Sequence, residues 1–141
     1  MPPVSNVAAH AEPIVIRQVF RHWSITIPAA FEETFVHEDG YWHAWDDRRS
    51  VSLTSLAITD HGKRPVSSRR ILERFPAGPG SRVAMPIGLN GWAVNVTQEQ
   101  PARASRAISG LVAVDGGVLI ATVTAEDLAW ATGVWRSIRR S

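Results

Sequence analysis

Apolar and polar residues alternate strictly in several short stretches of the chain, and this pattern predicts β-strands. In residues 22–28 the side chains of Trp23, Ile25 and Ile27 fall on one face, because successive strand residues point to opposite sides. Pro28 ends that strand, since proline has no N–H to donate to a neighbouring strand. Comparable patterns predict further strands at residues 14–20, 41–45, 51–59, 82–87 and 92–96.

A β-hairpin is predicted near the end of the chain. Residues 105–114 and 118–124 are two apolar runs, and Asp115, Gly116 and Gly117 lie between them. An Asp-Gly pair favours a tight turn, because such a turn needs residues that tolerate a positive φ. Strands joined by so short a turn must be antiparallel.

Two helices are predicted. Residues 65–75 form the first, with Ser67 as its N-cap, and the Pro- and Gly-rich residues 76–80 stop it. The second begins at Thr124, where the following acidic residues complement the positive end of the helix dipole. Three- and four-residue steps give this helix an apolar stripe of Leu128, Ala131, Val134, Trp135 and Ile138. Its last turn is expected to hold Arg136, Arg139 and Arg140.

The order of these elements predicts the fold class. Residues 29–36 are expected to form a short helix or an irregular turn, because Phe31 and Phe35 are four positions apart. The whole chain lacks strict β–α alternation, which indicates an α+β fold. We expect a curved antiparallel β-sheet with the C-terminal α-helix packed on one face and one further short helix. We expect a single domain over residues 14–141 after a disordered lead over residues 1–13.

Composition removes several kinds of chemistry. The 141 residues include no cysteine, which excludes disulfides, thiolate metal sites and cysteine nucleophiles. No apolar run approaches the roughly 18 residues of a membrane span. The first residues lack the basic and apolar regions of a secretory signal, so we predict a cytoplasmic protein without membrane contact.

Charge is distributed unevenly along the chain. Residues 1–60 carry eight acidic and four basic side chains, whereas residues 61–141 carry five acidic and eleven basic ones. A basic face could serve an acidic partner or a nucleic acid. Nucleic acid is not favoured, because the chain has no recognisable nucleic-acid-binding motif and only one lysine. The candidate basic residues are Arg69, Arg70, Arg74, Arg82, Arg103 and Arg106.

Motifs for metal binding and catalysis are absent from the sequence. Residues 37–47 hold two histidines and four carboxylates, but His37 and His43 are six positions apart and match no ligand pattern. There is no G-x-S-x-G elbow, and the Gly-rich residues 78–82 lack a phosphate-binding lysine. Asp46 and Asp47 are adjacent and would point to opposite sides of an extended chain. We therefore predict no metal and no cofactor, and an enzyme is not favoured.

Six tryptophans are the unusual feature of the composition. Trp23, Trp92 and Trp135 fall on predicted apolar faces and are expected in the core. Trp42 and Trp45 lie beside a charged corner, and Trp, Tyr and Arg commonly anchor protein interfaces. This segment could instead close one edge of the core. The candidate partner-binding residues are Tyr41, Trp42, Trp45, Asp46, Asp47, Arg48, Arg49, Arg103 and Arg106.

Three segments resemble the PsbP-like superfamily. They are the early strand of residues 23–28 that ends in proline, the late hairpin of residues 113–122, and the end of the final helix at residues 134–139. Members of this superfamily are largely binding or assembly proteins. The resemblance therefore implies a fold and a general role, and the chain carries no photosystem or Ran-binding signature.

Two functions follow from these observations. The first is a non-enzymatic domain that binds a protein partner or self-associates, such as a bacterial immunity or secretion-accessory protein. The alternative is a small ligand-binding domain or enzyme, with a pocket between the sheet and the helices that includes His43 and Asp46. A flat aromatic patch would favour the first, and a deep pocket with convergent polar groups the second.

Overall fold

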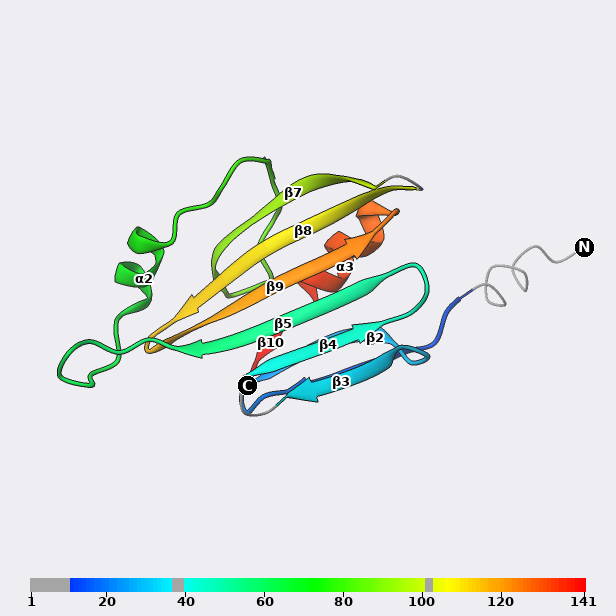
Figure 1. Cartoon of the computed structure of the whole chain (residues 1–141). Coiled ribbons are helices and arrows are strands. Elements are labelled where there is room, and N and C mark those ends of the chain that lie inside the picture. The colour runs from blue at the N-terminus through cyan, green and yellow to red at the C-terminus, as the bar shows by residue number, and fades with distance from the viewer. Residues whose placement is uncertain (1–10, 37–39, 101–102) are drawn as a thin grey trace, which may run out of the picture.

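The computed structural model describes residues 11–36, 40–100 and 103–141, which form two antiparallel sheets and two helices (Figure 1). The larger sheet has seven strands, in the order β3 (Glu32–Val36), β4 (Tyr41–Trp45), β5 (Ser50–Ala57), β9 (Gly117–Ala125), β8 (Arg103–Val114), β7 (Asn90–Gln100) and β6 (Ser81–Arg82). The smaller sheet has the order β1 (Ile14–Val19), β2 (Trp23–Pro28) and β10 (Arg139–Arg140). The helices are α2 (Ser68–Arg74) and α3 (Leu128–Arg136).

These elements confirm the α+β class and the late hairpin. β8 and β9 pair from Arg106 opposite Ala125 to Val114 opposite Gly117, which leaves Asp115 and Gly116 as the turn. Gly116 has a φ of 84°, the left-handed conformation that the Asp-Gly pair predicts. The first two strands form a separate small sheet with β10, a division that the strand pattern did not predict.

Several local predictions are wrong, among them the strand at residues 82–87, where β6 ends at Arg82. Residues 32–36 form β3 instead of a helix or turn, because they pair along β4 with Phe35 opposite Trp42. The final helix does not begin at Thr124, since β9 continues to the buried Ala125 and Asp127 is the N-cap. The Asp127 carboxylate accepts hydrogen bonds from the backbone N–H groups of Ala129 and Trp130, at 2.9 and 3.3 Å.

The last turn of α3 also differs from the prediction. Only Arg136 of the three arginines lies in it. Arg139 and Arg140 leave the helix and pair with β2 opposite Ser24 and Trp23. This return adds β10 to the small sheet as a third strand beside β2.

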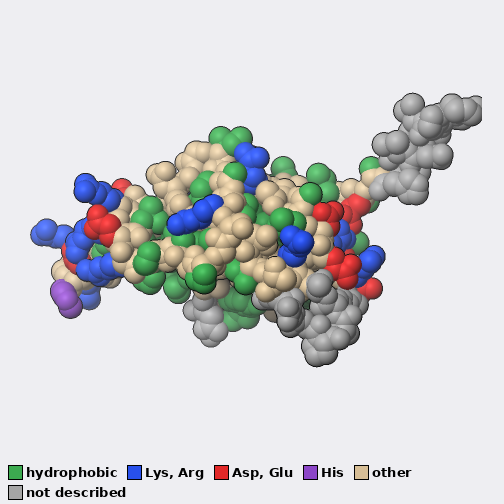
Figure 2. All heavy atoms as spheres, turned by 90° about the horizontal axis from the view of Figure 1, so that it is seen from above, with side chains coloured by type: hydrophobic (Ala, Val, Ile, Leu, Met, Phe, Trp, Pro, Cys, Tyr) green, Lys and Arg blue, Asp and Glu red, His purple; other side chains and the backbone are tan. Residues whose placement is uncertain are grey.

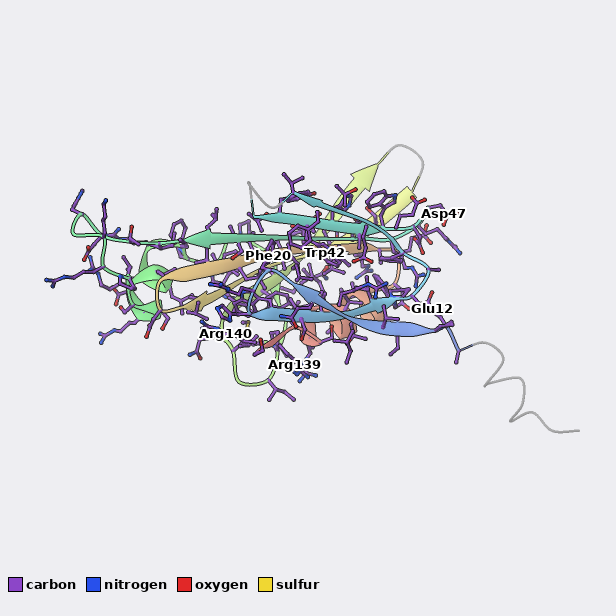
Figure 3. The ribbon with its side chains drawn as sticks, turned by 90° about the horizontal axis from the view of Figure 1, so that it is seen from below. Glu12, Phe20, Trp42, Asp47, Arg139 and Arg140 are labelled. Atoms are coloured by element: carbon purple, nitrogen blue, oxygen red, sulfur yellow. The ribbon has the colours of Figure 1, made fainter. Side chains whose placement is uncertain are left out.

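The main core lies between the seven-stranded sheet and a second layer made of the small sheet and α3 (Figure 3). Trp23 and Trp135 are buried there as predicted. The indole of Trp135 packs directly on Gly110 of β8, where an added Cβ would overlap its six-membered ring. Its N–H donates to the carbonyl of Ala84 at 3.0 Å, which fastens the segment before β7 to the core.

A smaller cluster lies on the opposite face of the seven-stranded sheet, at one end. The α2 residue Ile71 is buried there with Leu111 of β8 and Val118 of β9. Ser67 caps α2 as predicted, since its hydroxyl accepts the N–H of Arg70 at 3.3 Å. Trp92, expected in the main core, is only partly buried and packs against this second cluster.

Neither described helix is long and apolar enough to cross a membrane.

Candidate functional site

No helix among the described residues covers much of one face of the seven-stranded sheet, and β4 places three aromatic side chains on this face. We call these three residues, Tyr41, His43 and Trp45, the aromatic row. They are half-buried and alternate along β4 with Trp42 and Ala44, which are buried in the main core. The two-residue period of a strand produces this division. We call the face that carries the aromatic row the open face.

The rings of the aromatic row contact one another. His43 and Trp45 are stacked, with ring centroids 4.8 Å apart and planes inclined by 26°. Tyr41 and His43 are 6.2 Å apart and inclined by 41°. The hydroxyls of Tyr41 and Ser52 lie within hydrogen-bond distance at 3.4 Å. Because the facing ring surfaces of His43 and Trp45 are occupied by each other, they are not free to stack on a base or a sugar.

Hydroxyl side chains continue the open face across the next two strands. In the strand register, His43 lies opposite Ser52 and Ser52 opposite Thr122, while Trp45 lies opposite Ser50. These side chains are half-buried. We call them the hydroxyl strip: Ser50, Ser52, Thr54, Thr122 and Thr124.

On β4, β5 and β9 the open face carries no formal charge, whereas the exposed Glu32 of the edge strand β3 lies opposite Trp45. On β4, β5 and β9 the face presents only the aromatic row, the hydroxyl strip and aliphatic residues such as Ile120, which is 37% exposed. Burial lowers the pKa of His43, which keeps its imidazole neutral at neutral pH. Depletion of charge together with aromatic residues is typical of the centre of a protein interface.

His43 is expected to titrate below the ordinary histidine range of about 6.5, because partial burial beside Trp45 disfavours the imidazolium form. Its folded-state pKa lies below its unfolded-state pKa, so the free energy of unfolding should fall as pH drops below about 6.5. An NMR pH titration of the His43 ring protons measures the midpoint. His43→Gln should remove this part of the pH dependence, and a midpoint at or above 6.5 would contradict the assignment.

Trp42 is not a contact residue, contrary to the sequence prediction. It is 2% exposed and lies between the two layers (Figure 3). Its indole N–H donates to the carboxylate of Glu33 on β3 at 3.2 Å. Proximity in sequence suggested that Trp42 and Trp45 act together, but an odd spacing along a strand puts them on opposite faces.

Arg49 and Asp46 are likewise occupied inside the protein. The Arg49 guanidinium donates to both carboxylate oxygens of Glu12, at 2.8 and 2.7 Å, and to Asp46, at 2.7 and 3.0 Å. It also lies over the ring of Trp130, 4.7 Å from the centroid, and over Phe31 at 5.3 Å. We call these five residues the Arg49 cluster. Predicted as partner-binding, Arg49 and Asp46 instead join the segment before β1, the β4–β5 turn and α3.

The pKa shifts follow from this cluster. The hydrogen bond from Arg49 is the main cause that lowers the pKa of Glu12. Burial by itself would raise the pKa of Asp46, but hydrogen bonds from the Arg49 side chain and from the backbone N–H groups of Arg48 and Arg49 hold it below its ordinary value. The pKa of Arg49 is raised, chiefly by its hydrogen bond to Glu12. All three groups are therefore charged at neutral pH.

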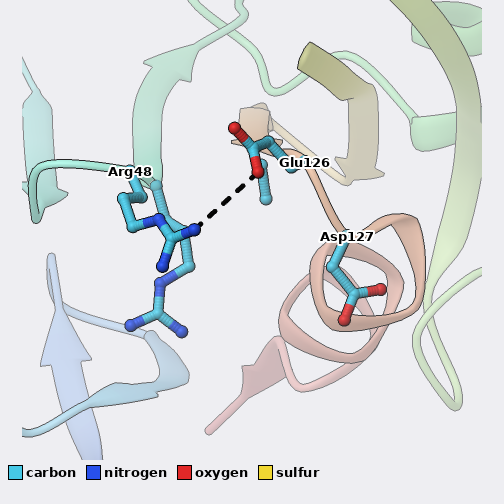
Figure 4. A pocket seen from close by; sticks show the side chains of 5 residues that line it. Arg48, Glu126 and Asp127 are labelled. Carbon is cyan, nitrogen blue, oxygen red and sulfur yellow. Dashed lines mark ion pairs between the residues drawn. The ribbon is translucent and has the colours of Figure 1, made fainter. Parts of the chain in front are cut away.

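Arg48 borders a hollow beside the Arg49 cluster (Figure 4). The hollow has a volume of about 220 Å³ and is lined also by Arg49, Ala125, Glu126 and Asp127. Arg48 forms a long ion pair with Glu126 at 4.0 Å, and its side chain is 68% exposed. Asp127 already caps α3. Since Arg49 and Asp127 are occupied, the hollow presents no convergent set of free polar groups.

The remaining predicted site residues do not join the aromatic row. Asp47 is exposed at the β4–β5 turn (Figure 3). Arg103 belongs to β8, and its side chain lies outside the described residues. Arg106 is exposed on β8 and has the same parity as Ile108 and Gly110, so it lies on the α3 side of the sheet. The open face therefore unites Tyr41 and Trp45 with His43, which sequence reasoning had placed in the rival pocket.

Several basic side chains gather at one end of the molecule, and others are scattered over the rest of the face shown in Figure 2. Lys63, Arg64, Arg69, Arg70 and Arg74 are exposed on α2 and the loop before it. Arg69 has an ion pair with Glu73 at 3.5 Å. Arg106 lies near the start of β8, whereas α2 packs against the end of that strand. Arg106 is therefore separated from the α2 arginines with which it was expected to share a basic face.

The predicted pocket between sheet and helices is filled in this structure. Trp135, Ile108 and Leu119 are fully buried and occupy the space between α3 and the seven-stranded sheet. His43 faces away from that space, and Asp46 lies in the Arg49 cluster. Across residues 11–36, 40–100 and 103–141, no three histidines or carboxylates are grouped so that they could hold a metal ion. His37 lies outside the described residues.

The fold has relatives among solved structures, but comparison of sequences finds none. No protein-family model matches the chain, and no curated protein is similar to it. A crystal structure of a protein from Bacteroides thetaiotaomicron VPI-5482 aligns over 84% of this chain with a TM-score of 0.58 and 9% sequence identity. The chain spans 45% of that protein's length. This likeness supports the α+β arrangement alone.

Proposed function

We propose that this protein is a non-enzymatic binding domain that holds a protein partner against its open face. The observation that carries the proposal is the aromatic row, which β4 turns away from the core while Trp42 faces into it. Trp and Tyr are frequent anchors of protein interfaces, because they bury a large area with few rotatable bonds. The neutral centre of the face allows burial without stranding a charge.

The proposed mechanism is occlusion of the partner's own surface. The hydroxyl strip beside the aromatic row can exchange hydrogen bonds with partner groups or with bridging water as Trp45 and Tyr41 become fully buried. No covalent step is involved. The same proposal includes a bacterial immunity or secretion-accessory role and a cytoplasmic location. It also includes the resemblance to the PsbP-like superfamily.

Replacing Tyr41 and Trp45 together by serine should weaken partner binding at least tenfold, because two half-buried anchors are lost from one surface. A photo-cross-linking residue placed at Ser52 in the cell should trap the partner, and the double variant should lose that product. Circular dichroism should show an unchanged fold, since neither side chain belongs to the buried core.

Phe75 supplies a matched control for this experiment. It is 45% exposed and follows α2, away from the aromatic row. Phe75→Ser should leave the Ser52 product intact. Cross-linking that survives in the Tyr41/Trp45 variant, or that is lost equally in Phe75→Ser, would reject the open face as the binding surface.

A further inference from the structure

The small sheet has an unpaired edge at β1. Its strand order is β1-β2-β10, so β1 pairs with β2 on one side and with no described strand on the other. An exposed strand edge presents a row of free N–H and C=O groups to which another strand can add. The β1 edge belongs to the layer that lies against the inner face of the seven-stranded sheet, so it is separate from the open face.

The register identifies which backbone groups point outward. Ala29 donates its N–H to the carbonyl of Pro13 at 2.9 Å, which marks Pro13–Ala29 as a hydrogen-bonded pair. Bonded and non-bonded pairs alternate in an antiparallel ladder, so Val15–Ile27 and the pairs two and four residues further on are also bonded. The N–H and C=O groups of Ile14, Ile16 and Gln18 therefore point away from β2.

Thr26, which lies opposite Ile16 on β2, independently supports this assignment of bonded and non-bonded pairs. Thr26 donates its N–H to the hydroxyl of Ser137 at 3.0 Å, on the side of β2 that faces α3. Thr26 thus does not bond to Ile16 across the ladder. The outward groups of Ile16 remain available at the edge.

The side chains at this edge are unusually apolar. Ile14 is 65% exposed and Ile16 is 74% exposed. Proteins commonly protect strand edges with charges or proline. The only charge within β1 is Arg17, and its guanidinium is turned to Glu33 on β3 at 2.8 Å. By contrast, β3, an edge strand of the seven-stranded sheet, carries exposed Glu32 and Glu33.

We infer that two copies of this chain associate by antiparallel pairing of their β1 edges. With Ile16 on the two-fold axis, each Ile14 lies opposite Gln18 of the second copy, and the two Ile16 side chains meet. Every outward backbone group of the three residues then has a partner. The exposed side chains of β1, those of Ile14, Ile16 and Gln18, are neutral, so identical copies do not repel each other there.

This pairing would join two small sheets into one continuous six-stranded sheet. Both open faces stay uncovered, because they belong to the other layer of each copy. The association is therefore independent of the proposed function and would make the protein bivalent toward its partner.

Sedimentation velocity of the full chain, from about 1 µM to a few hundred µM, tests the pairing. We expect a concentration-dependent species of twice the 15.5 kDa monomer mass. Ile16→Lys should raise the dissociation constant at least tenfold, because like charges would meet on the axis. Hydrogen exchange at the amides of Ile14, Ile16 and Gln18 should slow as concentration rises, which burial of side chains alone would not produce.

Two lysine variants at other exposed isoleucines serve as controls. Ile87 lies in the segment before β7 and is 72% exposed, and Ile120 lies on the open face. The control variants are Ile87→Lys and Ile120→Lys. Neither should change the mass. A chain that stays monomeric throughout the range, a dimer lost only in Ile120→Lys, or unchanged β1 amide exchange would each overturn the inference.

Discussion

Replacing Trp135 by alanine is expected to lower the free energy of unfolding by about 3–5 kcal/mol, the range for loss of a large buried aromatic side chain. Trp135 is 0% exposed and belongs to the main core between α3 and the seven-stranded sheet. The substitution would leave a cavity against Gly110 and would remove the hydrogen bond to Ala84. Urea denaturation followed by circular dichroism measures the loss.

A pair of variants at Gly110 and Trp135 tests this geometry more sharply. Gly110→Ala should be destabilising, because the new Cβ would overlap the six-membered ring of Trp135. Trp135→Phe removes most of those overlapping atoms. Gly110→Ala should therefore cost less in the Trp135→Phe background than in the natural chain, a non-additive double-mutant cycle. Simple additivity, or a Trp135→Ala loss below about 1 kcal/mol, would contradict the close packing of Trp135 on Gly110.

Replacing Arg49 by methionine should lower the free energy of unfolding by about 1.5–3 kcal/mol, the range for a hydrogen bond to a charged group. Methionine keeps an apolar stem against Trp130 and Phe31 but removes the guanidinium. Asp46, whose side chain is 25% exposed, would lose its ion pair inside the Arg49 cluster. Partial exposure of the cluster places the expected value toward the lower end of the range. Thermal denaturation in low salt measures the change.

The acid dependence of stability provides a second measurement on the same cluster. The pKa values of Glu12 and Asp46 are lowered in the folded protein. Their contribution to the free energy of unfolding is therefore complete at pH values above their unfolded-state pKa values. It is lost as pH falls below about 4.5 and the carboxylates become protonated. Arg49→Met should flatten the stability profile in that range.

Arg48→Met is the matched control for Arg49→Met. Arg48 is adjacent in sequence, but its side chain is 68% exposed and its ion pair with Glu126 is long, at 4.0 Å. Such a pair contributes little to stability. A loss of stability in Arg48→Met equal to that in Arg49→Met would show that the internal position of Arg49 has no special effect.

The positions of several strands and the late hairpin could be predicted, because these features depend on residues close together in the chain. Trp23, Ile25 and Ile27 reveal a strand by their alternation, and the Asp115–Gly116 pair favours the positive φ that its turn needs. The start of α2 also follows from a local signal, the Ser67 N-cap. Each of these features requires only a backbone period or a bond within a few residues.

Other elements depended on pairing with distant segments. The spacing of Phe31 and Phe35 suits one turn of helix, yet Phe35 lies in β3 opposite Trp42 and contacts Phe20, with ring centroids 5.4 Å apart. The N-cap of α3 is Asp127 instead of the predicted Thr124, because Ala125 continues β9 and is buried in the main core. A local spacing that fits two structures is resolved by whichever tertiary contacts bury more apolar surface.

The candidate site divides in the same way. Alternation in residues 41–45 already assigns the aromatic row to one face of a strand and Trp42 to the other, which the grouping by sequence proximity overlooked. It does not say which face the second layer covers. Nor does it reveal that Arg49 bonds to Glu12, 37 residues earlier in the chain.

Local residue patterns are therefore enough to predict strand and helix periods and the hairpin turn, and composition is enough to exclude cysteine chemistry. Long-range packing buries Trp42, pairs Arg49 with Glu12 and leaves Tyr41, His43 and Trp45 on the open face. Alternation is a local property of the backbone. Burial depends on which distant segments pack together, and hence on the free energy of the whole arrangement.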